Sequence, residues 1–293
     1  SYQNEADIPL LIGVDEEGGT VVRVSSNPNL RETPFLSPKD TYADGGWDAV
    51  KQDAEEKADL LLSLGINVNL APVCDMTSDE YGFMYDRSFS SDVDMENRYV
   101  RTVVETSKSK KLGTVLKHFP GYGNNSDTHK GIAYDDRDYS EFENTDFKPF
   151  YQGIESGADC ILVSHNIVNC MDSEYPASLS QKVHDILRNE FKFDGVIMTD
   201  DLIMDAITDF TGDEAAAVTA AKCGNDLLCC SSVDTQYPAV LEAVQNGEIS
   251  EAQVDASVKR ILKWKQNLGI FNIDTYQKKV KSTEPTDTVG SEE

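Results

Sequence analysis

The segment KHFPGYGNNSDTH, residues 117–129, is crowded with side chains that titrate or bind metals, and it holds two of the chain's four histidines. Asp127 stands two residues before His129, a spacing at which a carboxylate can hydrogen-bond one ring nitrogen while the other nitrogen transfers a proton. Lys117 and His118 are consecutive at the start of the segment, and two glycines give the following loop conformational freedom. An Asp-x-His pair alone is a weak signal, because most such pairs are solvated loop residues.

A pair of aspartates, Asp200 and Asp201, ends the apolar run GVIMTDD. Adjacent side chains on a strand point to opposite faces, so at most one of the pair can face a pocket. A carboxylate in that place suits a nucleophile, a base or a metal ligand. The competing interpretation is that an aspartate caps the helix that follows, which is common at strand–helix junctions.

Short apolar runs alternate with helical patterns along the chain. The runs are continuous rather than alternating, which is typical of strands buried on both faces of a parallel sheet; they cover 9–15, 66–75, 113–118, 159–165, 195–201 and 226–230. Apolar residues recur at helical spacing between the runs, and Ser180 is a predicted N-cap. The helical segments are 47–64, 95–104, 145–156, 180–191, 213–223, 238–246 and 251–268. This alternation predicts an α/β fold, either a (β/α)8 barrel or a doubly wound sheet.

The polar residues at the ends of the runs favour the barrel. Five of the six runs end in charge or imidazole, at Asp15-Glu16-Glu17, Asp75, Lys117-His118, Ser164-His165 and Asp200-Asp201. In a barrel, the C-terminal ends of the strands converge on one pocket. A doubly wound sheet usually carries a glycine-rich phosphate loop, and Gly18-Gly19 does not belong to a GxGxxG motif. We therefore predict a TIM-barrel-like fold, of which six strands are recognisable.

The charge balance disfavours several classes of partner. The chain has 26 basic and 52 acidic residues and a net charge of −26. Binding of nucleic acid or of an anionic membrane surface needs clustered Lys and Arg, so a small neutral substrate fits better. No apolar run is long enough to span a membrane. Residues 277–293 are polar and aperiodic, so we expect a disordered tail after a single domain of residues 1–276.

A metal site is one alternative at the strand ends. Asp15, His118, His165 and Asp200 could serve as ligands in a barrel metallohydrolase. Such barrels commonly open with an HxH pair, which this sequence lacks, so we expect neither a metal nor an organic cofactor. His184 falls inside a helical stripe, where packing is the expected role.

Taken together, these segments resemble the bacterial β-N-acetylhexosaminidase branch of glycoside hydrolase family 3. The motifs that carry the resemblance are GVDEEGGTVVRV (13–24), NLAPVCD (69–75), YDRSFSSD (85–92), KHFPGYG with DTH (117–129), GVIMTDDLIM (195–204) and SVKRILKWK (257–265). The KHFPG block combined with the TDDL strand is highly specific. The resemblance also implies that the family's first strand and helix would precede residue 1.

The resemblance implies a role for each matching position. Asp200 matches the nucleophile that forms a covalent glycosyl-enzyme, His129 matches the general acid/base, and Asp127 matches the partner of that histidine. The positions that hold the N-acetylglucosamine (GlcNAc) ring and its acetamido group are matched by Asp15, Arg23, Arg87, Lys117 and His118. Most retaining glycosidases use two carboxylic residues, whereas here a His–Asp dyad takes the acid/base role. Tyr122 departs from the family pattern, which usually has a second histidine there.

The implied function is that of a retaining exo-β-N-acetylglucosaminidase acting on peptidoglycan fragments or chitooligosaccharides. The alternatives are a β-glucosidase-type member of the family and a catalytically silent barrel that binds sugars. Phosphate in place of water could also resolve the intermediate, because a neutral imidazole does not repel an anionic acceptor. The acidic surface favours an exported or cell-surface bacterial form, whereas the six cysteines, expected to be unpaired, favour the cytoplasm. The oligomeric state is not indicated.

Overall fold

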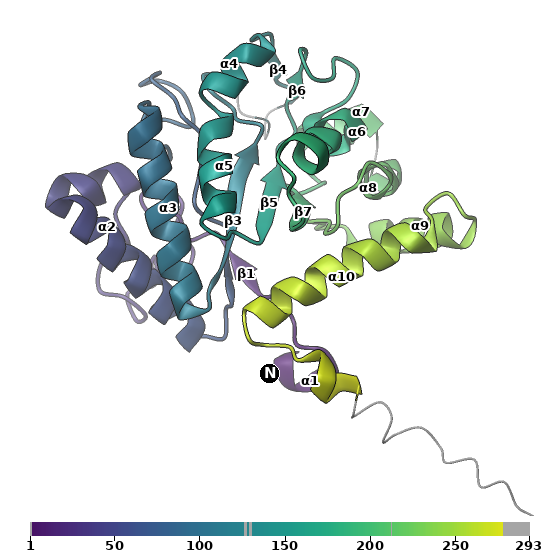
Figure 1. The fold of residues 1–293 in the computed structure, drawn as a ribbon, viewed down its shortest axis with the longest axis horizontal. Coiled ribbons are helices and arrows are strands. Elements are labelled where there is room, and N and C mark those ends of the chain that lie inside the picture. The colour runs from purple at the N-terminus through teal and green to yellow at the C-terminus, as the bar shows by residue number, and fades with distance from the viewer. Residues whose placement is uncertain (1, 126–127, 129–130, 212, 278–293) are drawn as a thin grey trace, which may run out of the picture.

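A curled sheet of five parallel strands forms the centre of the computed structural model, which describes residues 2–125, 128, 131–211 and 213–277 (Figure 1). The strands are β1 (Gly13–Val14), β2 (Val68–Asn69), β3 (Gly113–Phe119), β5 (Cys160–Val163) and β7 (Val196–Thr199). Their order in the sheet is β1-β2-β3-β5-β7, which follows the chain without reversal. A doubly wound sheet reverses its strand order at a switch point, so the barrel-like prediction is confirmed.

The sixth predicted run, 226–230, is hydrogen-bonded along the β7 edge of the sheet but does not form a regular strand. Leu227 forms a single parallel bridge with Met198, and the backbone N–H of Leu202 donates to the carbonyl of Cys229 at 3.0 Å. Within the described residues no strand pairing joins this run to β1. The sheet is therefore an open half-barrel, because a closed barrel needs continuous pairing around its circumference.

The predicted helices lie between the strands, with shifted ends. They are α2 (Pro38–Ser63), α3 (Val93–Lys110), α5 (Phe147–Glu155), α6 (Gln181–Asp185), the π-helical turn η3 (Ile186–Glu190), α8 (Asp213–Lys222), α9 (Val233–Gln245) and α10 (Glu251–Asn267). Ser180 caps α6 as predicted, since its hydroxyl accepts the N–H of Val183. No helix in the described part of the chain has both the length and the apolar composition needed to cross a membrane.

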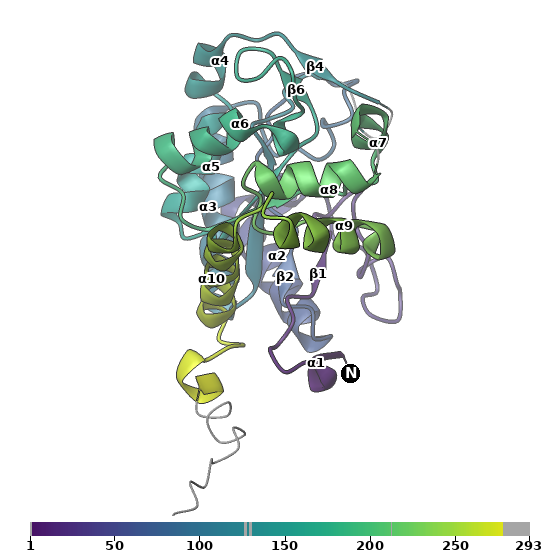
Figure 2. The same ribbon diagram turned by 90° about the vertical axis from the view of Figure 1, so that its right-hand side faces the viewer.

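Several short elements were not predicted. They are α1 (Tyr2–Glu5), α4 (Tyr139–Asn144), α7 (Asp205–Thr211), the 3-10 turn η2 (Ala177–Leu179), and a parallel pair of two-residue strands, β4 (Tyr134–Asp135) and β6 (Ile167–Val168). The β4–β6 pair and α4 lie at one end of the molecule and α1 lies at the other (Figure 2). Elements of two to seven residues are too short to show a reliable period in sequence.

Side chains on the central strands alternate between an outer and an inner core. Ile161, Val163 and Ile197 belong to the outer core, which also contains Val100 and Val104 of α3 and Phe150 of α5. Cys160, Leu162, Val196 and Met198 belong to the inner core. This two-residue period is the one that pleated strands impose, and it makes both faces of each strand apolar.

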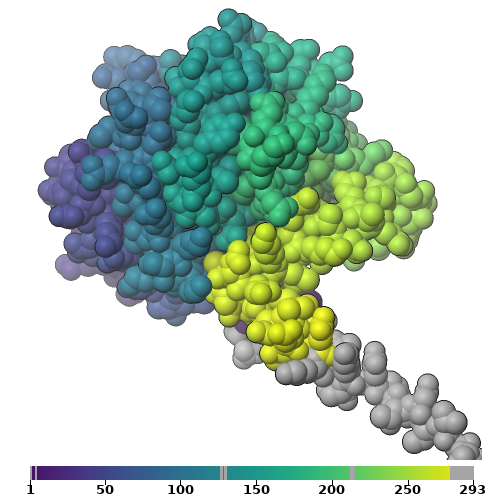
Figure 3. All heavy atoms as spheres, in the orientation of Figure 1, coloured from purple at the N-terminus to yellow at the C-terminus, as the bar shows by residue number. Residues whose placement is uncertain are grey.

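Helix α10 covers part of the inner face of the half-barrel. Its Trp264 is 2% exposed and packs in one cluster with Val68 of β2, Val115 of β3 and Val196 of β7. Figure 3 shows α10 and α9 (yellow to yellow-green) as a ridge along the lower edge of the molecule. Helix α10 thus shields apolar strand residues that the open sheet leaves uncovered.

Helix α5 packs closely on β3 at Gly153. A Cβ atom at this position would lie 2.5 Å from Cδ1 and 2.6 Å from Cδ2 of Leu116, which is 0% exposed. Real Cβ contacts are not that short, so either the helix or Leu116 would have to move.

We expect Gly153→Ala to lower the free energy of unfolding by about 1–3 kcal/mol, because overpacking outweighs the better helix propensity of alanine. Urea unfolding measures the change. Lys148→Ala, at an exposed site on the same helix, serves as the control and should stay within about 0.5 kcal/mol of the parent chain. An unchanged or higher stability of Gly153→Ala would contradict the close packing.

Candidate active site

A cavity of about 410 Å³ brings together six of the eight predicted site residues: Asp15, Arg23, Arg87, Lys117, His118 and Asp200. Leu70, Leu162 and Met198 line its apolar part, and they belong to or pack against the inner core of the half-barrel. Parallel strands that curl toward a barrel direct their C-terminal ends to one place, which explains the convergence. The other two predicted residues, Asp127 and His129, lie outside the described residues.

The two adjacent aspartates have different roles in the structure. Asp200 continues the inward alternation of Val196 and Met198 and lines the cavity. Asp201 also lines it, so the prediction that at most one of the pair faces a pocket is wrong, because the regular strand ends at Thr199, before the pair. Asp201 accepts the backbone N–H groups of Ile203 and Ser231, both at 3.2 Å, and also the hydroxyl of Ser231. It thereby ties the segment after β7 to residue 231. The local structural role expected for one aspartate of the pair therefore falls to Asp201.

The surroundings of Asp200 favour its ionised form. Burial works against ionisation, but the neighbouring groups, of which His165 contributes most, outweigh it and hold the pKa of Asp200 below its usual value. The N–H of Asp201 donates to Oδ1 of Asp200 at 2.9 Å. Among the described residues, Oδ2 has no hydrogen-bond partner and can act on a ligand.

Glu17 is the central anion of the site, although the sequence did not predict it as a site residue. Its carboxylate accepts Nε of Arg87 at 2.9 Å and Nη2 of Arg87 at 2.8 Å, and it pairs with Nζ of Lys117 at 2.7 Å. Burial opposes ionisation, yet Lys117 and Arg87 lower the pKa of Glu17 to about 2. This two-pronged contact with a planar guanidinium fixes the direction of Arg87.

Lys117 remains charged although it is only 3% exposed. Burial lowers its pKa, but Glu17 and Asp15 raise it by more, so the net shift is upward. Its Nζ donates to Oδ1 of Asp15 at 2.6 Å. The ammonium therefore joins β3 to the segment that follows β1.

Asp75 fixes the orientation of His118. The Oδ2 of Asp75 accepts the backbone N–H of His118 at 3.0 Å and lies 2.7 Å from the ring Nδ1. Nη2 of Arg87 lies 3.2 Å from the other ring nitrogen, Nε2. A guanidinium has only donors, so Nε2 must accept, and the imidazole is neutral with its proton on Nδ1.

Lys117 and His118 both reach the cavity although they are consecutive. The ladder between β3 and β5 loses its register between Leu116 and Phe119, and the peptide bond between Lys117 and His118 is cis. The sequence left open whether one or both of the two side chains enter the pocket. In the structure both do.

Arg23 is the cation of the cavity that is most available to a ligand. It is exposed, and within the described chain its guanidinium makes one hydrogen bond, to the carbonyl of Val22 at 3.3 Å. Glu16, which is 0% exposed, holds the backbone of this turn by accepting the N–H groups of Arg23 at 2.9 Å and of Val24 at 2.7 Å. A buried carboxylate thus presents Arg23 to the cavity.

The remaining two described histidines lie in the interior. Nε2 of His165 lies 3.0 Å from the carbonyl of Asp201, and Nδ1 lies 2.7 Å from the hydroxyl of Ser178, so His165 supports the strand end that carries Asp200. His184 packs inside, as predicted, with Nδ1 2.7 Å from the carbonyl of Ser180. Burial lowers the pKa of His184.

The geometry bears on the metal alternative. Across residues 2–125, 128, 131–211 and 213–277, no group of three or more His, Cys, Asp or Glu side chains is placed to hold a metal ion. Both ring nitrogens of His118 already have partners, and Asp15 is bonded to Lys117. These two side chains would have to leave their present partners to bind a metal.

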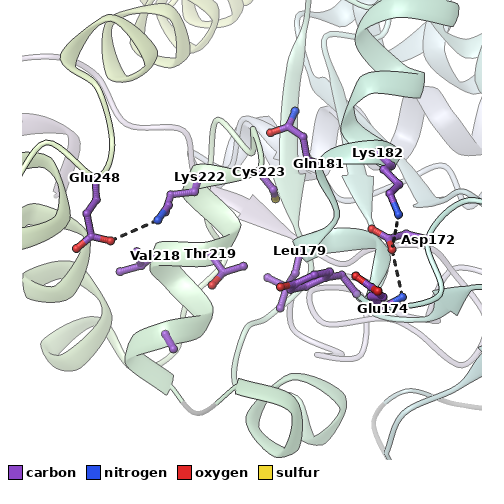
Figure 4. Close-up of a pocket in the computed structure, with 12 residues that line it drawn as sticks. Asp172, Glu174, Leu179, Gln181, Lys182, Val218, Thr219, Lys222, Cys223 and Glu248 are labelled. Atoms are coloured by element: carbon purple, nitrogen blue, oxygen red, sulfur yellow. Dashed lines mark hydrogen bonds and ion pairs between the residues drawn. The ribbon is translucent and has the colours of Figure 1, made fainter.

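A larger hollow, of about 610 Å³, lies beside α8 and is lined by the segment 172–182 (Figure 4). Its charged groups pair with one another, Lys182 with Asp172 at 3.2 Å and Lys222 with Glu248 at 3.3 Å. None of the predicted site residues lines it. The smaller cavity is therefore the candidate active site.

Two site residues that were not predicted, Glu17 and Asp75, have partial signals in the sequence. Glu17 follows Asp15 by two positions, the spacing at which side chains share a face, and Asp75 ends a predicted strand. Nothing in the sequence showed which cation each carboxylate meets, because the partners come from other strands.

Comparison with known proteins agrees with these features. The Glycosyl hydrolase family 3 N terminal domain matches residues 1–264. Beta-hexosaminidase of Hydrogenovibrio crunogenus is 32% identical over 252 residues, which cover 84% of this chain and 70% of that protein. A glycoside hydrolase family 3 beta-N-acetylglucosaminidase from Paenibacillus sp. superposes with a TM-score of 0.83 and 29% identity, over 97% of this chain and 53% of that chain.

A second solved structure, M tuberculosis LpqI, has a TM-score of 0.81 and 30% identity, over 88% of this chain and 77% of that chain. The chain thus spans about half of the Paenibacillus protein and larger shares of the other two. Since the family domain extends over most of the sequence and the relatives share both fold and sequence with it, the chain belongs to glycosyl hydrolase family 3.

Proposed function

We propose that residues 1–276 form the catalytic domain of a retaining exo-β-N-acetylglucosaminidase, which removes terminal β-linked GlcNAc. The observation that carries the proposal is the placement of Asp200 in one cavity with Lys117, His118 and Arg23. The ionised state favoured at Asp200 suits a nucleophile. Relatives named beta-hexosaminidase and beta-N-acetylglucosaminidase support the choice of sugar.

The proposed first step forms a covalent glycosyl-enzyme. Oδ2 of Asp200 attacks the anomeric carbon, the bond from this carbon to the glycosidic oxygen breaks, and His129 gives its proton to the leaving oxygen. Asp127 is the proposed partner that orients His129 and stabilises its protonated form. In the second step His129 takes a proton from water, the water oxygen bonds to the anomeric carbon, and Asp200 leaves as a carboxylate. Each step inverts the configuration at the anomeric carbon, so the two steps together retain it.

The sugar-binding roles divide according to the partners that each residue already has. Among the described residues Arg23 has donors without a partner, and Asp15 has a second carboxylate oxygen, so both can bond hydroxyl or acetamido groups directly. Arg87 and Lys117 are held by Glu17, which presents them at fixed positions. His118 is held by Asp75, and its place at the cavity wall is fixed in the same way.

The natural substrates proposed are peptidoglycan fragments or chitooligosaccharides. Each could present the terminal β-GlcNAc that an exo-acting enzyme requires. Assaying GlcNAc and glucose aryl glycosides side by side separates this proposal from a β-glucosidase. A chain that binds GlcNAc oligosaccharides without cleaving them would be a silent sugar-binding barrel. Release of GlcNAc-1-phosphate in phosphate buffer would show phosphorolysis in place of hydrolysis.

We expect Asp200→Ala to lower kcat on an aryl β-GlcNAc glycoside by roughly a thousandfold or more, because the nucleophile is lost. A slow fluorinated GlcNAc substrate should label the parent chain at the peptide that contains residue 200, as peptide mass will show. Asp201→Asn is the matched control: it perturbs the neighbouring aspartate, and labelling should persist. Full activity of Asp200→Ala, or a label on another peptide, would exclude this nucleophile.

We expect Glu17→Gln to remove part of the acid sensitivity of folding. Since the pKa of Glu17 falls from 4.5 to about 2 on folding, its ion pairs stabilise the fold fully above pH 4.5. This stabilisation, about 3 kcal/mol by linkage, is lost as pH falls toward 2. Urea unfolding across this range should show that the difference in the free energy of unfolding between the parent chain and the variant becomes smaller as pH falls.

Glu143→Gln, at an exposed carboxyl on α4, is the control and should follow the parent chain within about 0.5 kcal/mol at each pH. The Glu17→Gln variant should also cleave the GlcNAc glycoside more slowly, because Lys117 and Arg87 lose the anion that positions them. If the free energy of unfolding changed with pH in the same way for Glu17→Gln and for the parent chain, the buried ion cluster would be contradicted.

A further inference from the structure

Ile203 is an exposed apolar residue at the candidate active site, and the proposed chemistry gives it no role. It follows Asp200 by three positions, lines the same cavity and is 46% exposed. The other apolar residues that line this cavity are buried or half-buried. A single exposed apolar side chain is common on protein surfaces, but one that lines the mouth of a cavity is placed to contact a ligand.

The turn that carries Ile203 is anchored on both sides of this residue. The N–H of Leu202 donates to the carbonyl of Cys229 at 3.0 Å, and the N–H of Met204 donates to the carbonyl of Asp201 at 3.1 Å. The N–H of Ile203 itself donates to Oδ1 of Asp201 at 3.2 Å. Leu202 and Met204 are 0% and 7% exposed, so the side chains on either side of Ile203 hold the turn to the interior. An anchored turn therefore presents Ile203 to solvent.

The lining of the cavity differs between its interior and its mouth. Lys117 and His118 are buried, and they supply charged and polar partners in the interior. Arg23 and Ile203 are the exposed lining residues, so they mark the mouth. A terminal sugar needs several hydrogen-bond partners, which favours the interior. The leaving group of an exo-acting enzyme then extends through the mouth, past Ile203.

We propose that Ile203 is a specificity-determining residue, which contacts the leaving group and favours leaving groups with an apolar face beside the glycosidic oxygen. The inference rests on the proposed function, because it places the terminal GlcNAc in the interior of the cavity. Such a contact removes apolar surface of Ile203 from water, which is favourable. An aromatic ring and the C–H face of a second pyranose both offer surface of this kind.

The test compares two leaving groups that differ in apolar surface but have similar acidity. Benzyl β-GlcNAc and methyl β-GlcNAc both release an unactivated alcohol, so the bond to be broken is alike, and only the benzyl group adds an apolar face. We expect Ile203→Ser to lower kcat/KM on the benzyl glycoside by about fivefold, because apolar contact is lost. On the methyl glycoside the change should be less than about twofold. Ile203→Leu keeps the apolar area and should retain the preference of the parent chain for benzyl.

Inhibition by free GlcNAc reports on the interior of the cavity alone. Since GlcNAc carries no leaving group, its inhibition constant for Ile203→Ser should stay within about twofold of the parent value. Ile273→Ser is the matched control, because Ile273 is 38% exposed and lies outside the residues that line the cavity. This variant should equal the parent chain in all three measurements.

Three results with Ile203→Ser would overturn the inference: an equal loss on both glycosides, no loss on either, or weaker inhibition by GlcNAc. The first would indicate general damage to the turn, and the last would place Ile203 beside the terminal sugar. A parent chain that cleaves neither glycoside would contradict the proposed function instead. The dissociation constants of the two glycosides, measured by calorimetry on the parent chain and on Ile203→Ser, then test the contact by the same comparison.

Discussion

The carboxylate of Asp75 sets the geometry on which the candidate site depends. It is 0% exposed, and it holds the backbone and ring of His118 and the backbone of Tyr122. A buried charge that lost these partners would be strongly destabilised, so residues 118–122 keep one arrangement. The tautomer of His118 follows from it, and Arg87 then meets both the imidazole and Glu17. One anion therefore orders the β3 end before any ligand arrives.

The cavity gathers cations in a chain that is strongly acidic overall. Arg23, Arg87 and Lys117 all line it, although the net charge of the chain is −26. Glu17 and Asp15 neutralise two of these cations, and Asp200 stays ionised beside them. Such alternating charge in a partly buried space can hold a neutral, hydroxyl-rich ligand, since Glu17 orients Arg87 and Lys117 before a ligand arrives.

The apolar runs predicted the strands and their parallel order because strands buried on both faces read as continuous apolar segments. The motif resemblance led to Asp200, which continues the inward alternation of β7 and lines the cavity, although Asp201 lines it as well. The ion cluster around Glu17 was not predictable, because it joins segments far apart in the chain, 102 residues for Asp15 and Lys117. The sixth run also looked like an ordinary strand, since apolar content does not show whether its backbone hydrogen bonds form a regular ladder.

The packing of Trp264 and Val68 in one apolar cluster has a consequence for how the chain folds. These residues lie far apart in the chain, yet they share one apolar cluster with β3, β5 and β7. During synthesis from the N-terminus, the concave side of the early strands stays exposed to water until α10 emerges. Contacts between such distant residues also slow folding, because a long loop must close before they form. The fold is therefore complete only after α10 has packed on the strands. Nascent chains that end before α10 expose an apolar surface, to which chaperones and other nascent chains can bind.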